Sequence, residues 1–175
     1  MSSIEEITRE LHALTAGVER AQRLAVAADS QAQDVAVRAA SAGFAAVAAG
    51  IARVRAAVST IQGGLGSLAT AVGEATKAAA SVPRQATPQE TIAGLAPVQQ
   101  GIANAHETTT ATITHVDNAR QLVSAALYGG QPGPLLQALD SIKQVLVLLV
   151  QRSGTAQKAV ETATNQARQL GSSGN

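Results

Sequence analysis

Hydrophobic and small residues recur every three or four positions through the first half of the chain, in two successive registers. The first register consists of Ile4, Ile7, Leu11, Leu14, Val18, Ala21, Ala25, Ala28, Ala32, Val35, Ala39 and Ala42. The second consists of Phe44, Val47, Ile51, Val54, Val58, Ile61, Leu65, Leu68, Val72, Ala75, Ala79 and Val82. Residues at this spacing share one face of an α-helix, and their heptad order is typical of helices that pack along a seam. The pattern predicts long helices near residues 3–41 and 44–81.

The change of register falls at Gly43 and Phe44, and two structures would produce it. In the first, Gly43 takes a left-handed conformation and closes a tight hairpin of two helices. In the second, one helix continues while its buried face rotates, and it would be about 115 Å long. The sequence leaves both structures open. At the start of the first helix, Ser3 and Glu6 have the spacing of a capping box.

Two loops divide the rest of the chain, the first with two prolines between Ser81 and Pro88 and the second rich in glycine and proline. After the first loop, Thr87 can cap a helix, Pro88 suits its first turn, and Glu90 completes a capping box. The second loop runs from Tyr128 to Pro134 and contains residues that reverse a chain. We therefore expect a single helical domain over residues 1–175, with further helices near 87–128 and 134–170, loops at 82–86 and 129–133, and a flexible tail at 171–175.

The four predicted helices have similar lengths, each about 55–60 Å. Equal lengths favour an all-α fold of long antiparallel helices, either a four-helix bundle or a coiled-coil-like assembly. The alternative is one very long N-terminal helix with two shorter helices packed along it. Composition agrees with a thin, helical core, because 46% of the residues are hydrophobic but Phe44 and Tyr128 are the only aromatic ones.

The segment Val145–Val150 is apolar on every face of its predicted helix. Such a segment is either buried all round or in contact with a partner subunit. We predict that the side chains that mediate assembly are Val145, Leu146, Leu148 and Leu149. On this interpretation, a double substitution of Leu146 and Leu149 by aspartate would abolish assembly. The run is far shorter than the roughly 20 residues of a membrane-spanning helix, so no transmembrane segment is expected.

Charges and reactive residues offer little chemistry. The formal net charge is +1 and no run of five like charges occurs, so we expect no nucleic-acid binding. The chain has no cysteine, and its histidines, His12, His106 and His115, lack the spacing of metal ligands. We interpret them as surface residues. The sequence therefore predicts no catalytic, metal or cofactor site, and a protein that is not an enzyme.

Glycines are frequent in the second predicted helix, at positions 50, 63, 64, 66 and 73. Each glycine disfavours an isolated helix by roughly 1 kcal/mol relative to alanine. Close packing against another helix is the favoured compensation, which makes this helix a candidate for an intimate interface.

Residues 1–82 resemble the WXG-type helical hairpins exported by type VII secretion systems, in hairpin size and in the position of the turn. Here Ser41-Ala-Gly-Phe44 stands where that family has Trp-x-Gly. The whole chain also resembles an uncharacterised actinobacterial all-helical family, in the blocks GFAAVAAGIARVRAAV, LAPVQQ and GGQPGPLLQALDSIKQVLVLLVQRSG. The first resemblance implies an accessory or substrate of a type VII-like export apparatus. The second implies no activity.

Together these features predict a non-catalytic helical interaction protein, either a homo-oligomer or the partner of another helical protein. Two alternatives are an amphipathic protein that coats a lipid surface or granule, in the manner of phasins, and a structural rod or filament subunit. The acidic N-terminus, MSSIEEITRE, lacks the features of a cleavable signal peptide. We expect a cytoplasmic location, or export without such a peptide.

Overall fold

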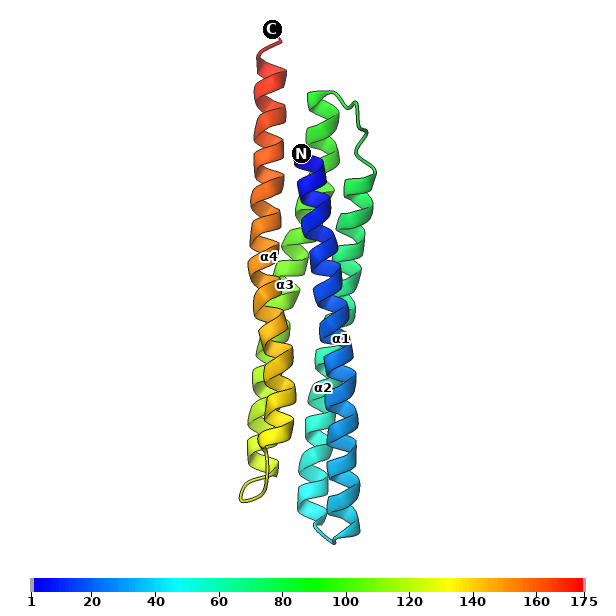
Figure 1. Ribbon diagram of the computed structural model, residues 1–175, viewed down its shortest axis with the longest axis vertical. Coiled ribbons are helices and arrows are strands. Elements are labelled where there is room, and N and C mark those ends of the chain that lie inside the picture. Colours follow the sequence, from blue (N-terminus) through cyan, green and yellow to red (C-terminus); the bar gives the residue numbers. More distant parts are fainter. Residues whose placement is uncertain (1, 175) are drawn as a thin grey trace.

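The computed structural model describes residues 2–174 and is a bundle of four long helices. They are α1 (Ser3–Ser41), α2 (Ala45–Ala80), α3 (Pro88–Ala126) and α4 (Gly133–Ser172), and the described residues include no strand. The helices run alternately up and down (Figure 1). α1 packs against α2 and α4, and α3 packs against the same two helices. The prediction of an all-α fold of antiparallel helices is confirmed.

The chain turns back at Gly43, which decides between the two structures left open by the sequence. Gly43 has φ of +84°, the left-handed conformation that glycine adopts without strain. The Phe44 N–H donates to the Ala39 carbonyl oxygen at 2.8 Å, and the Gly43 N–H to that of Ala40 at 3.1 Å. These two bonds form a Schellman motif, which ends a helix. The first two helices therefore form a hairpin, and the continuous N-terminal helix is excluded.

Phe44 was predicted to lie in the buried seam of the second helix, but it lies outside the core. It is the N-cap of α2 and its side chain is 62% exposed. The core of α2 begins one heptad later, at Ile51, with Val47 half-buried between them.

Capping boxes start α1 and α3. In α3 the box consists of Thr87 and Glu90, as predicted, and Pro88 occupies the first turn. In α1 it consists of Ser2 and Glu5, one residue earlier than the predicted pair Ser3 and Glu6. Both serines have a glutamate three residues later, so the spacing alone could not choose between them.

The capping glutamates are held in their charged form. The Ser2 N–H donates to Glu5 Oε2 at 2.8 Å, and this bond, followed by the one with the Ser2 hydroxyl, lowers the Glu5 pKa below its ordinary value of 4.5. Thr87 lowers the Glu90 pKa in the same way. Because both pKa values fall on folding, this stabilisation is complete above the ordinary pKa and is lost as the pH falls through the lowered one.

α4 is the longest helix and continues to Ser172, two residues past its predicted end. Gly171 and Ser172 of the predicted flexible tail are therefore helical, and Asn175 lies outside the described residues. By length and composition alone, α4 is apolar enough to cross a membrane. A core helix meets the same criterion, and α4 supplies buried residues along its whole length, from Leu135 to Ala167.

Candidate interaction surfaces

Three of the four predicted assembly residues face the interior of the bundle. Val145, Leu146 and Leu149 are buried, whereas Leu148 is 56% exposed. The reason is that α4 packs against both α1 and α3, so its inward surface covers more than one seam. Val145, Leu146 and Leu149 are therefore core residues of this fold and are not a surface for a partner. Leu148 lies outside, next to the partly exposed Val147.

The interface between α2 and α3 is built on glycines that let the two helices approach closely. A Cβ atom at Gly50 would lie 2.8 Å from the Ala126 Cβ, and one at Gly64 would lie 2.5 Å from the Thr112 hydroxyl oxygen. On α3, a Cβ at Gly101 would approach the Ala75 Cβ to 2.8 Å. Such contacts are closer than van der Waals packing allows. For Gly50 and Gly64, the predicted close packing is confirmed.

The other glycines of α2 face outward. A Cβ atom at Gly63, Gly66 or Gly73 would meet nothing within 4 Å, so no neighbour in the bundle accounts for them. They belong to an exposed face that has no large side chain over several helical turns. One heptad row of this face, which we call the α2 outer stripe, consists of Arg53, Ala56, Thr60, Gly63, Ser67, Thr70 and Glu74. All seven residues are exposed.

Ion pairs connect the other three helix interfaces. Arg55 of α2 binds Asp29 of α1 through two hydrogen bonds of 3.0 and 3.2 Å, and the carboxylate raises the Arg55 pKa. Arg152 of α4 lies 3.2 Å from Glu10 of α1. The pair Lys143 and Asp117 links α4 to α3 at 2.7 Å. Pairs at this exposure stabilise a fold only modestly, so their main effect is to favour one register of the helices.

Arg120 of α3 belongs to the same group of charges. Its Nε lies 2.9 Å from Asp140 Oδ1, at ion-pair distance but without the alignment of a hydrogen bond. Its Nη1 lies 3.9 Å from Asp117 Oδ1.

His106 is half-buried and bonded, unlike the surface histidine that the sequence predicted. Its Nδ1 lies 2.8 Å from the Oγ of Ser153, a buried residue. The Ser153 hydroxyl donates its hydrogen to the Val150 carbonyl oxygen at 2.8 Å, so toward His106 it can only accept a hydrogen bond, from the Nδ1–H. This arrangement joins α3 to α4 and does not activate Ser153 as a nucleophile.

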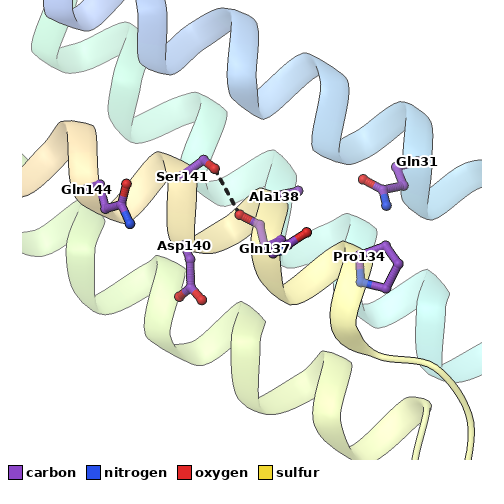
Figure 2. A pocket seen from close by; sticks show the side chains of 7 residues that line it. All are labelled: Gln31, Pro134, Gln137, Ala138, Asp140, Ser141 and Gln144. Carbon is purple, nitrogen blue, oxygen red and sulfur yellow. Dashed lines mark hydrogen bonds between the residues drawn. The ribbon is translucent and has the colours of Figure 1, made fainter.

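A shallow hollow of about 550 Å³ lies on α4 near its N-terminal end, with one residue of α1 at its rim (Figure 2). Amide and hydroxyl groups provide most of its polar lining, from Gln31, Gln137, Ser141 and Gln144. Its one carboxylate, Asp140, is paired with Arg120, and the Ser141 hydroxyl donates to the Gln137 carbonyl oxygen at 3.0 Å. These residues offer hydrogen bonds to a ligand but no acid and base placed to act together.

Metal ligands do not converge in residues 2–174, where no group of three or more His, Asp or Glu side chains could hold an ion.

Comparison with known proteins agrees with the resemblance to an uncharacterised family. No curated protein matches the chain. Residues 86–172 match a family of unknown function, DUF6244, and this similarity covers α3 and α4 but neither α1 nor α2.

Proposed function

We propose that the protein is a non-catalytic helical assembly protein, in which two copies associate through the α2 outer stripe. The observation that carries this proposal is the outward position of Gly63, which lies in the stripe, while Gly66 and Gly73 lie in the adjacent row of the same exposed face. Each of them disfavours the helix by roughly 1 kcal/mol relative to alanine. No contact within the bundle offsets that cost. A second helix packed on this face would offset it, as α3 does for the inward glycines of the same helix.

The sequence of the stripe fits a second copy of itself. If two α2 helices cross antiparallel with Gly63 at the centre, Thr60 of each copy lies opposite Ser67 of the other, and Ala56 opposite Thr70. The same register brings Arg53 of each copy to Glu74 of the other. Small residues thus meet at the centre, where backbones approach, and opposite charges meet at both ends. Such a contact is self-complementary, as a two-fold interface requires.

Charge exchange along the stripe tests this register. We expect Arg53→Glu to weaken the dimer, because it would place two carboxylates together at each end of the contact. Combining Arg53→Glu with Glu74→Arg should restore the wild-type dimer, since the opposite charges are only exchanged. The mass of each variant, measured by light scattering over a range of concentrations, checks the expectation.

Arg23, exposed on α1, provides the matched control. Arg23→Glu makes the same change of charge away from the stripe and should leave the mass unchanged. A wild-type protein that stays monomeric at all concentrations would contradict the proposal. A dimer that Arg53→Glu does not weaken would also contradict it.

A role in type VII-like export belongs to the same proposal, as an accessory or a substrate. The hairpin of α1 and α2, which turns at Gly43, supports it. Secretion of the chain by an actinobacterial host, and its loss when the export ATPase is deleted, would test this role. A continuous helix through Gly43 would have favoured the alternative of a rod or filament subunit, and the turn at Gly43 does not provide that support.

A further inference from the structure

The two aromatic residues of the chain lie at the same end of the bundle. Phe44 is in the turn between α1 and α2, and Tyr128 follows α3 in the turn to α4. The alternating helices place both turns together at the lower end in Figure 1. Phe44 is 62% exposed and Tyr128 is 95% exposed. Aromatic side chains normally supply core area, so a fold that leaves both in solvent at one end has an unusual surface there.

This end is also nearly free of charge. Residues 35–52, which surround the first turn, contain one charged residue, Arg38, and residues 121–139, around the second turn, contain none. The opposite end contains many acidic and basic side chains. Those of α1, α2 and the following loop are Glu5, Glu6, Arg9, Glu10, Glu74, Lys77 and Arg84. The bundle therefore has a charged end and a nearly uncharged, aromatic end, which we call the aromatic tip.

Additional apolar surface adjoins the aromatic tip. Val37, in the last turns of α1, is mostly exposed. A shallow hollow of about 450 Å³ between α2 and α3 is lined by small and apolar side chains and by Arg53. The lining residues other than Arg53 are Ala46, Val47, Ala49, Gly50, Leu122, Ala125 and Ala126.

We infer that the aromatic tip docks on an anionic phospholipid bilayer, with Phe44 and Tyr128 at the level of the lipid headgroups. Tyrosine favours this interface because its ring is apolar and its hydroxyl is polar. The charged residue nearest the first turn is a cation, Arg38, which is exposed and would be attracted to anionic headgroups, with Asp34 one helical turn behind it.

Co-sedimentation with vesicles of phosphatidylcholine and phosphatidylglycerol tests the inference on the full chain. The wild-type protein should sediment with them. Substituting both Phe44 and Tyr128 by serine should lower the partition coefficient at least about tenfold, from the apolar area withdrawn from the bilayer. Arg38→Gln should lower it about fivefold, and this loss should vanish on vesicles of phosphatidylcholine alone. Because the substituted side chains are exposed, helix content by circular dichroism should not change.

A second measurement reports on the tip directly. Tyr128 is the only tyrosine and the chain has no tryptophan, so its fluorescence comes from this one position. Vesicles should protect that fluorescence from quenching by acrylamide in the wild-type protein.

The control substitutes serine for two exposed aliphatic residues away from the tip, Val26 (62% exposed) and Leu170 (70% exposed). This variant should bind vesicles as the wild-type protein does. Absence of sedimentation would overturn the inference. Binding that persists without Phe44 and Tyr128, or that leaves Tyr128 open to acrylamide, would overturn it as well.

Discussion

Replacing Leu146 by aspartate is expected to unfold the protein, whereas the same substitution at Leu148 should leave it folded. Leu146 has no exposed surface and lies in the core, whereas Leu148 is 56% exposed. A carboxylate at position 146 would be buried without a partner, at a cost of about 4 kcal/mol or more, which is a large share of the stability of a typical domain. Thermal unfolding followed by circular dichroism distinguishes the two variants. A cooperative transition near the wild-type midpoint for Leu146→Asp would contradict the burial of Leu146 in the core.

This expectation changes what the double substitution of Leu146 and Leu149 would report. Both residues are core residues, so their replacement by aspartate would destroy the bundle itself. A loss of assembly in that variant would follow from unfolding and would say nothing about an interface.

Replacing Gly101 by alanine is expected to destabilise the bundle by about 1–2 kcal/mol, against the sign of helix propensity. The new Cβ would lie 2.8 Å from the Ala75 Cβ and 3.2 Å from both the Cα and the backbone nitrogen of that residue. Backbone atoms cannot move aside as the end of a side chain can, so α2 and α3 would have to separate. Urea unfolding monitored by circular dichroism measures the change.

Gly154 on α4 is the matched control, because a Cβ there would meet nothing within 4 Å. Gly154→Ala should raise stability by up to about 1 kcal/mol, the ordinary gain from replacing a helical glycine. Opposite signs for the two substitutions are the expected result. If both variants were stabilised, the close contact between α2 and α3 would be contradicted.

The helices and their order could be predicted from the sequence. The buried residues of each helix repeat in heptads, and prolines and capping residues mark the helix ends. The turn at Gly43 could not be predicted, since the heptad pattern continues on both sides of it and a rotated seam would have the same spacing. The structure decides the question by hydrogen bonds of Phe44 and Gly43 that no pattern specifies. The α1 cap was misplaced by one residue because two serines have equivalent spacing.

The candidate surfaces were harder to predict, since they depend on which helices are neighbours. Val145–Val150 is apolar all round, and only its contacts with α1 and α3 show that Leu146 faces inward and Leu148 outward. Glycines of α2 predicted a close approach, but the sequence could not separate Gly64, which faces Thr112 of α3, from Gly63, where an added Cβ would meet nothing within 4 Å. The aromatic tip was missed for the same reason. Its signal was present in the two solitary aromatic residues, each next to a predicted turn.

The most direct test of the proposed assembly uses the absence of cysteine from the chain. A single Gly63→Cys substitution places one thiol where the two α2 outer stripes cross, so mild oxidation should link two chains through Cβ atoms close enough for a disulfide. Thr70→Cys, on the same stripe, should not form this link, because residue 70 lies opposite Ala56 of the other copy. Ser30→Cys, exposed on α1, should not form it either. Rapid and selective linkage at position 63 is the predicted result, and equal linkage at all three positions, or none at position 63, would contradict assembly through α2.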